Sequence, residues 1–478
     1  MKTAQNSSGK EGLFTGTWTQ VFAAIVGTLF AICDGMNYGW TSPIIPYLVS
    51  EESHIKTTLH EAEYLETALM VGSFFGLPGT IYFVNKIGRK KSLLLAAVVN
   101  LICWIIVGFA DTMVYLFVAR FFFGMAANMS FVAAPMYVAE IADQKIRGFL
   151  SSITYLMMLV GFIIVYSIGP YTPFYITPVI GCIILLIELS TFIFMPESPY
   201  YLLYHQKYAE AKKSLQYFRP NRNITEELDE ISKAVERQKA EHGRIMDLVV
   251  VPSNRKALII MTVLNGGQHL VAISVILMNL HSILQSADSV YMDSSHAAIL
   301  FSVIMLVSAQ MASLQVDRYG RKVLLIASTI MTAFCMLALA IYFNLKHNQY
   351  DVKGISWIPI ASVMVYAFTF KMGLGIVPII ITSEIFTAKL KAIGMTIADA
   401  WYVIGAIVSV EIYQSLSLYG YHVPFYVFTF CSFLIAAFTY FYIPETKGKT
   451  LEEIQMLLKG EVVPVKNREE AEKMLSVL

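Results

Sequence analysis

Long apolar stretches of about 20 residues recur along the whole chain, separated by short polar segments. Twelve of them can be placed, at 19–41, 64–84, 92–110, 113–134, 150–169, 174–195, 257–283, 295–316, 322–343, 356–381, 392–416 and 422–443. Such a stretch is long enough to cross the hydrocarbon core of a bilayer as a helix. The pattern predicts an all-α integral membrane protein with twelve transmembrane helices.

The basic residues are distributed unevenly around these spans. If both termini lie on one side of the membrane, all but five of the 35 Lys and Arg residues fall on that side. The exceptions are Lys56, Lys346 and Lys353 on the opposite side, and Arg120 and Lys371 within spans. Because basic loops remain in the cytosol, we expect both termini to be cytosolic.

One polar segment, 196–256, is much longer than the other connections. Its stretches 207–219 and 226–241 are rich in Ala, Lys, Glu and Leu, which favour helix. The expected organisation is therefore an N-terminal six-helix bundle, a cytosolic helical linker, a C-terminal six-helix bundle and a cytosolic tail. Their boundaries are 1–195, 196–256, 257–443 and 444–478.

Composition and missing motifs narrow the function further. Only 14% of the residues are charged, against about a quarter in soluble proteins, and the net charge of +1 indicates no nucleic-acid partner. The chain has no phosphate-binding Gly-x-x-x-x-Gly-Lys-Ser/Thr loop, no His-Glu-x-x-His helix and no Gly-x-Ser-x-Gly turn. We therefore expect neither an ATP-driven pump nor an enzyme, and no cofactor or metal.

Polar landmarks repeat in the same order in the two halves, which predicts an internal duplication. The matched pairs are Gly88-Arg89-Lys90 with Gly320-Arg321-Lys322, Glu140 and Arg147 with Glu384 and Lys391, and Pro196-Glu197-Ser198-Pro199 with Pro444-Glu445-Thr446. All of them follow spans on the cytosolic side.

These landmarks suggest two charge clusters at the cytosolic helix ends. The expected members are Arg89, Arg147 and Glu197 in the first half, Arg321, Glu384, Lys391 and Glu445 in the second, and Glu140 at the seam. Ion pairs there would tie the halves together when a central cavity opens outward, and would have to break when it opens inward. The alternative is that the basic residues only set the topology.

Residues 22–454 resemble the sugar porter family of the major facilitator superfamily, which includes facilitative glucose transporters and insect trehalose transporters. The resemblance is strongest at Pro444-Glu445-Thr446-Lys447-Gly448-Lys449-Thr450-Leu451-Glu452-Glu453-Ile454. Arg120, Gly124 and Pro135-Met136-Tyr137 match the family pattern around span four. The resemblance implies the major facilitator fold. It also implies facilitated diffusion of a small-molecule sugar across the plasma membrane by a protein that functions in the bilayer as a monomer.

The resemblance also places the substrate site on span seven, with further contacts from spans five, ten and eleven. The implied substrate-binding residues are Gln268, His269, Ser274, Asn279, Tyr155, Trp401 and Gly375. Gln268 retains the first family glutamine, whereas His269 replaces the second and Tyr155 replaces an amide on span five. Asn279 lies eleven residues, about three helical turns, after Gln268, so we expect both on one face.

The identity of the substrate stays open because several sugar-reading amides of the family are replaced. A hexose, trehalose and another small polar solute all remain alternatives, as does a sensor without productive flux. Lys371 is either a rim residue of the outer funnel or a contact for an anionic or strongly hydrogen-bonding solute.

Coupling to protons is likewise open. Asn37 stands where proton-symporting relatives carry an aspartate, and an asparagine cannot titrate, which favours uniport. Asp34, one helical turn earlier, together with Arg120 forms a possible proton site, because ionisable groups inside the membrane are often functional.

Overall fold

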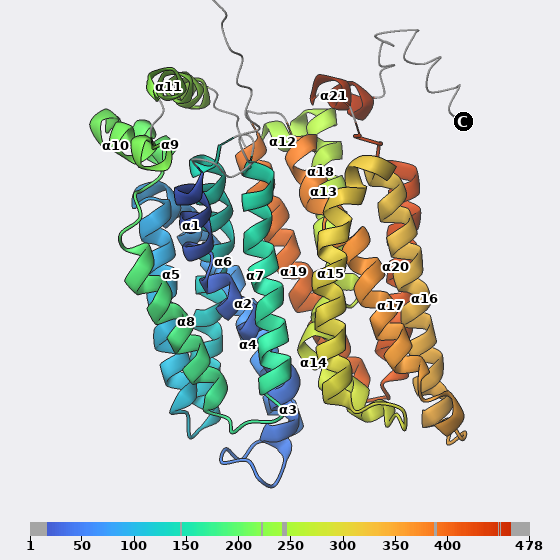
Figure 1. Ribbon diagram of the computed structural model, residues 1–478. Helices are drawn as coiled ribbons and strands as arrows, with labels where there is room; N and C mark the ends of the chain where they lie inside the picture. The colour runs from blue at the N-terminus through green and yellow to red at the C-terminus, as the bar shows by residue number, and fades with distance from the viewer. Residues whose placement is uncertain are drawn as a thin grey trace, which may run out of the picture.

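The computed structural model describes residues 17–143, 146–220, 223–240, 246–386, 390–447, 449 and 451–459. They form two helical bundles that stand side by side (Figure 1). The first bundle contains α1 (Trp18–Val26), α2 (Phe30–Gly39), α3 (Thr41–Val49), α4 (Leu59–Lys86), α5 (Arg89–Gly108), α6 (Met113–Ile141), α7 (Arg147–Ile168) and α8 (Ile176–Phe192). The second contains α13 (Pro252–Leu270), α14 (Ile273–Ala287), α15 (Ser294–Tyr319), α16 (Arg321–His347), η1 (Lys353–Ile355), α17 (Ile358–Met372), α18 (Val377–Ile385), α19 (Lys391–Ser417) and α20 (His422–Tyr442).

The predicted spans all fall on these helices. Eleven helical segments of the described chain are long and apolar enough to cross a membrane, and α8 is a shorter apolar helix between the fifth and sixth of them. Three segments join consecutive helices into one span, namely α1–α3, α13–α14 and η1–α18. The protein is a multi-pass membrane protein of twelve spans, as the apolar pattern predicts.

The outward faces of the bundles are apolar, as expected for helices in contact with lipid. On α5, Val98, Ile102 and Ile105 follow helical spacing and are exposed, whereas Asn100 and Trp104 on the other face are buried. This is the reverse of a soluble helix, because hydrocarbon is the solvent on the outer side.

The second span begins five residues before the predicted start, at Leu59. Thr58 and Glu61 form a capping box, in which the Thr58 hydroxyl accepts from the Glu61 N–H and the Glu61 carboxylate accepts from the Thr58 N–H at 3.0 Å. Two backbone donors are satisfied in this way, so the helix starts among polar residues. Glu66, two turns further along α4, is fully buried.

Spans seven and ten are broken near their middle. In span ten the backbone leaves the helix between Met372 and Val377, and the Leu374 N–H donates to Ser328 Oγ at 3.1 Å. The glycine-rich sequence there predicts this break. In span seven α13 ends at Leu270 and Ala272 is left-handed with φ 73°, which neither glycine nor proline signals. Broken helices within a membrane are tolerated where protein or a cavity satisfies the freed backbone.

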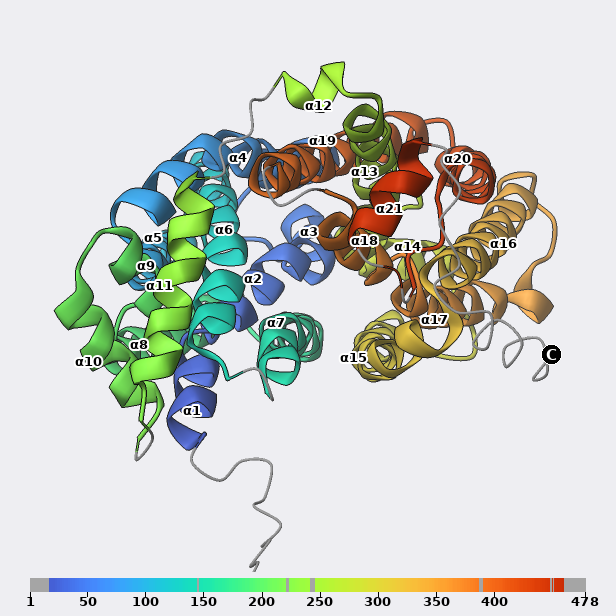
Figure 2. The ribbon, with the colours of Figure 1, turned by 90° about the horizontal axis from the view of Figure 1, so that it is seen from above.

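The linker helices all lie at one end of the bundles (Figures 1 and 2). They are α9 (Pro199–Tyr204), α10 (Tyr208–Phe218), α11 (Thr225–Ala240) and α12 (Asp247–Val250), and α21 (Leu451–Lys459) lies at the same end. Helices α9–α11 pack around a small apolar core that includes Leu202, Leu215 and Leu228. We call this end of the bundles the linker end, and the opposite end, with the loops at 50–58 and 169–175, the loop end.

Candidate functional site

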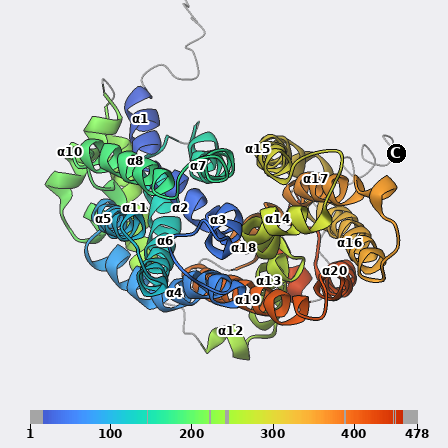
Figure 3. The same ribbon diagram turned by 90° about the horizontal axis from the view of Figure 1, so that it is seen from below.

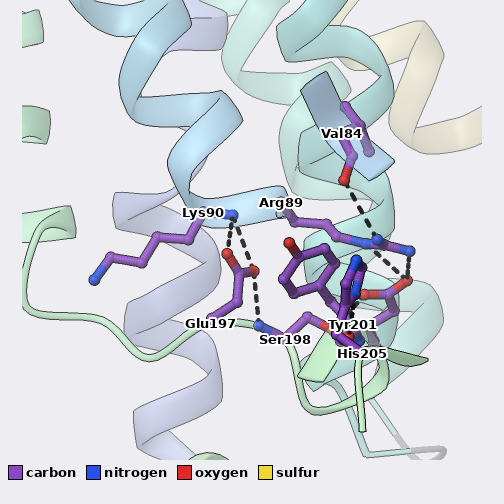
Figure 4. Close-up of polar contacts among 8 residues, drawn as sticks. Val84, Arg89, Lys90, Glu197, Ser198, Tyr201 and His205 are labelled. Atoms are coloured by element: carbon purple, nitrogen blue, oxygen red, sulfur yellow. Dashed lines mark hydrogen bonds and ion pairs between the residues drawn. The ribbon is translucent and has the colours of Figure 1, made fainter. Parts of the chain in front are cut away.

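At the linker end of the first bundle, two glutamates hold the turn between α4 and α5 (Figure 4). Arg89 Nη2 lies 2.9 Å from Glu140 Oε1, and Ser198 Oγ also donates to Glu140. Glu197 accepts the Lys90 N–H at 3.0 Å, so its carboxylate caps the first turn of α5. A Cβ on Gly88, whose φ is 104°, would lie 2.3 Å from Glu197 Oε2, so only glycine fits.

The second bundle repeats this arrangement, which confirms the duplication at the level of side-chain contacts. Arg321 Nη2 lies 3.1 Å from Glu384 Oε1, and Thr446 Oγ1 donates to Glu384 at 2.6 Å. Glu445 accepts the backbone N–H groups of Arg321 and Lys322, both at 3.0 Å. The chain after each bundle therefore fastens to the turn between its second and third spans.

The predicted memberships of the two charge clusters need correction. Glu140 lies in the first cluster and not at the seam, because its partners Arg89 and Ser198 belong to the same half. Glu197 caps backbone and forms no ion pair in the described chain, and Arg147 donates only a long bond of 3.4 Å to Ala142 O, with its buried Nε unpartnered. The side chain of Lys391 lies outside the described residues.

Hydrogen bonds between the bundles concentrate toward the loop end, where α3 and α14 lie side by side (Figure 3). Asn279 Nδ2 donates to Glu66 Oε2 at 2.9 Å, and both side chains are buried. Other bonds of this kind are Ser42 Oγ to His281 Nδ1 at 2.8 Å, Thr41 Oγ1 to Met278 O at 3.2 Å, Thr67 Oγ1 to Glu411 Oε1 at 2.9 Å, Gln414 Nε2 to Glu63 O at 2.8 Å, and Tyr166 OH to Leu277 O. We call this group of bonds the loop-end latch.

The linker end is different. Where both side chains are described, no hydrogen bond or ion pair joins the two bundles there, and the Arg89–Glu140 and Arg321–Glu384 pairs each stay within one bundle. Within the described part of the chain, the bonds between the bundles thus lie at the loop end and near the helix breaks.

A polar cluster lies between the bundles next to the break in span seven. Ser274 Oγ lies 2.7 Å from the Tyr38 hydroxyl and 2.5 Å from His269 Nδ1. The His269 ring packs edge-on against Tyr402, with ring centroids 4.1 Å apart. Near the break in span ten, Lys371 Nζ donates to the Tyr155 hydroxyl across the bundles. We call these residues the central cluster.

The predicted substrate residues divide between two places. Ser274, His269 and Tyr155 belong to the central cluster, and the neighbouring Gln268 is buried with its Nε2 unpartnered. Asn279 belongs to the loop-end latch instead. The expectation that Gln268 and Asn279 share one helix face is wrong, because the helix is interrupted at residues 271–272 between them.

The remaining two predicted substrate residues have unexpected neighbours. The Trp401 side chain is 41% exposed, and the ring that packs on His269 belongs to the next residue, Tyr402. Gly375 lies against Lys371, since a Cβ at this position would be 3.1 Å from Lys371 Cδ. Lys371 itself is only 3% exposed in this conformation, in which its Nζ contacts Tyr155 of the other bundle.

The arginine of span four is bonded to an amide and not to an acid. Arg120 Nη1 donates to Asn37 Oδ1 at 2.7 Å and to Asn37 O at 2.5 Å. Asp34 instead accepts from Asn100 Nδ2 at 3.2 Å. No ion pair joins Asp34 to Arg120, although both side chains are described, so the structure does not bring the expected pair together.

Glu66 and Tyr402 were missed at the sequence level. Glu66 lies within the predicted second span, 64–84, but was not singled out as a candidate site residue, although a carboxyl group inside a span is itself a signal of function. Nothing in the sequence distinguishes Tyr402 from its neighbour Trp401, since either ring could reach span seven.

Comparisons with known proteins agree with this architecture. The profile of the family described as "Sugar (and other) transporter" matches residues 20–458. The facilitated trehalose transporter Tret1 of Bombyx mori is 27% identical over 457 residues, covering 94% of this chain and 89% of that protein. Its counterpart in Polypedilum vanderplanki is also 27% identical, over 93% of this chain and 89% of that protein.

Among solved structures, the xylose transporter XylE from E. coli in a partially occluded inward-open conformation aligns with a TM-score of 0.73 and 21% identity. The alignment covers 91% of this chain and 100% of the XylE chain. This likeness shows a shared fold. Because the family profile spans nearly the whole chain, this protein belongs to the sugar (and other) transporter family.

Proposed function

We propose that this protein carries a sugar, a hexose or trehalose, across the plasma membrane by facilitated diffusion, working as a monomer through alternating access. Its similarity to proteins named facilitated trehalose transporters supports this substrate class. The predicted orientation puts the linker end in the cytosol, so the described conformation would be the one closed toward the outside.

One observation carries this proposal: among side chains that the structure describes, the bonds between the bundles belong to the loop-end latch and the central cluster. A carrier that alternates needs one end tied and the other end free, with a site between them. The Arg89–Glu140 and Arg321–Glu384 ion pairs at the linker end each lie within one bundle and so do not oppose opening there. The central cluster, at the two helix breaks, is the candidate site.

The chemistry of the central cluster fits a polyhydroxy solute. Gln268 Nε2 is buried without a partner, and a buried amide donor normally has one. A sugar hydroxyl would supply the missing acceptor, while the rings of Tyr155 and Tyr402 would pack against its apolar faces. We propose that the substrate is contacted by Gln268, His269, Ser274, Tyr155, Trp401 and Gly375. Asn279 would instead stabilise the closed loop end through its bond to Glu66.

Uniport is favoured by the partner of Arg120. Its guanidinium is bonded to the neutral Asn37 amide, which cannot bind and release a proton at that position. The carboxylates of Asp34 and Glu66 are engaged elsewhere, with Asn100 and Asn279.

Replacing Gln268 by alanine is expected to lower labelled-sugar uptake about fivefold to tenfold in proteoliposomes, because one neutral hydrogen bond contributes about 1 kcal/mol or slightly more. Glucose, fructose and trehalose are tested side by side with the wild type. Gln216→Ala, on an exposed face of α10, is the matched control and should transport normally. Saturable binding without any flux would instead indicate a sensor.

The proposed gate at the linker end is tested at Arg147. Among described residues its one hydrogen bond is the long one to Ala142 O, and its buried Nε has no partner. We propose that it reaches the cluster of Glu384 and Glu445 when the linker end closes. Arg147→Gln should then destabilise only that state and shift the population about fivefold toward the linker-end-open form, as expected for about 1 kcal/mol.

Spin labels at Phe149 and Val323, exposed residues near the linker end of each bundle, would report the shift as a longer mean distance in a cysteine-free background. Arg255→Gln, an exposed arginine at the same end, is the control. An unchanged distance distribution in Arg147→Gln would contradict the proposed gate.

A further inference from the structure

Lys371 is a cation enclosed between the bundles with no carboxylate beside it. Its side chain is 3% exposed, and it forms no ion pair with any described acidic residue. Its contacts are the Tyr155 hydroxyl and the faces of two rings, with Nζ 4.6 Å from the centroid of Tyr155 and 5.4 Å from that of Phe370. Burial of an ammonium group without an anion is costly, so such a group inside a membrane usually serves a ligand.

The backbone around Lys371 is built to hold this side chain in place. The lysine lies at the end of α17, just before the break in span ten. Gly375 leaves room for it, since a Cβ there would lie 3.1 Å from Lys371 Cδ. The Gly375 N–H donates to Phe370 O at 2.7 Å, which turns the chain back over the lysine. Tyr366, one turn earlier, donates to Val271 O at 2.8 Å and so fixes α17 against the break in span seven.

The central cluster also contains an unsatisfied donor, because Gln268 Nε2 is buried without a partner. The neighbouring His269 Nε2 is buried without a partner as well, and both belong to the helix end that Tyr366 contacts. Tyr402, which packs on His269, is an electrostatic neighbour of Tyr155, the partner of Lys371. A ligand that completes this cluster must therefore supply acceptors, and one of them should carry a negative charge.

We propose that the preferred substrate is an acidic sugar, a hexuronate, whose carboxylate replaces the Tyr155 hydroxyl as the partner of Lys371. This inference rests on the proposed transport function and specifies its substrate class. A single ammonium group matches one monovalent carboxylate, whereas a phosphate dianion would leave a charge uncompensated. The rings of Tyr155 and Phe370 would lie against the apolar face of the sugar ring, and Gln268 would bind one of its hydroxyls.

The site would also connect binding with the conformational change. The Lys371–Tyr155 bond joins α17 of the second bundle to α7 of the first. A carboxylate that takes over Lys371 would release this connection, so binding of the anion would make the separation of the two bundles at that level easier.

The test is uptake of labelled D-glucuronate and D-glucose by the purified protein in liposomes, for the wild type, Lys371→Met and Lys371→Arg. We expect saturable glucuronate uptake by the wild type, at least a tenfold fall in the ratio of glucuronate uptake to glucose uptake in Lys371→Met, and retention of the wild-type ratio in Lys371→Arg. Lys346→Met, at a lysine that donates to Ser286 O near the loop end, is the matched control. Retained glucuronate uptake by Lys371→Arg would show that Lys371→Met loses uptake because the positive charge is missing and not because the protein misfolds.

The outcomes separate the two proposals. Glucose uptake without glucuronate uptake or competition, or full glucuronate uptake by Lys371→Met, overturns the acidic-sugar inference and leaves the transport function standing. Glucuronate uptake alone supports the inference and contradicts a neutral sugar as the substrate. Uptake of neither solute by folded wild-type protein contradicts both.

Discussion

Asn279→Leu is expected to shift the protein about fivefold or more toward a state that is open at the loop end. In the described state, Asn279 Nδ2 donates to Glu66 Oε2 at 2.9 Å across the bundles, and both side chains are at most 3% exposed. Leucine cannot donate a hydrogen bond, so the buried carboxyl group of Glu66 loses its partner in the closed state. The bond is absent from the state that is open at the loop end, so the substitution destabilises only the closed state. Leaving a buried acceptor without its partner costs about 1–3 kcal/mol, which corresponds to about fivefold to hundredfold in population.

Spin labels at Tyr175 and Leu418, exposed near the loop end of the first and second bundles, would measure this shift as a longer mean distance. Asn265→Leu is the matched control on the same span, because Asn265 Nδ2 donates to Met261 O within its own helix. Equal distance distributions for Asn279→Leu and the wild type would show that the bond contributes nothing to closure.

Gly72→Ala is expected to destabilise the first bundle by about 3 kcal/mol or more, the upper range for overpacking a close contact. A Cβ on Gly72 would lie 2.0 Å from Phe121 O, and one on Gly124 would lie 2.0 Å from Leu69 O. The obstacles are backbone atoms of the facing helix, so α4 and α6 would have to move apart. Small residues at such crossings allow membrane helices to approach closely.

Thermal stability in detergent, followed by size-exclusion chromatography, measures the effect as a lower melting temperature and less monodisperse protein. Gly79→Ala on the same helix is the control, because the nearest atom to its Cβ is Phe83 Cε2 at 4.0 Å. Alanine favours helix over glycine, so this variant should be as stable as the wild type or slightly more so. Equal melting temperatures for Gly72→Ala and Gly79→Ala would contradict the packing of α4 against α6.

The spans could be predicted from sequence because the bilayer imposes a length and an apolar composition on each of them. The break in span ten was visible in Gly373, Gly375 and Pro378. The break in span seven was not, because Val271 and Ala272 carry no such signal and the left-handed Ala272 is held by tertiary contacts. That break is also why the helical spacing between Gln268 and Asn279 misled the prediction of a shared face.

Contacts between the bundles were harder to predict. The duplicated landmarks predicted that Arg89 and Arg321 meet glutamates at the linker end, but not that these two ion pairs each stay within one bundle or that Arg147 forms none with a described residue. Spacing along one helix carries no information about the facing bundle. The partnership of Glu66 with Asn279 therefore emerges only when the two bundles are placed together. That of Arg120 with Asn37 emerges only when α6 and α2 pack within the first bundle.

The most direct test of facilitated transport is the end point of labelled-sugar uptake in liposomes with no ion gradient, followed by the same measurement with an inward proton gradient and a protonophore. We predict saturable uptake that stops when the internal concentration of sugar equals the external one and that neither the gradient nor the protonophore alters. Accumulation above the external concentration that the protonophore abolishes would contradict uniport and assign a proton site to a carboxylate such as Asp34 or Glu66.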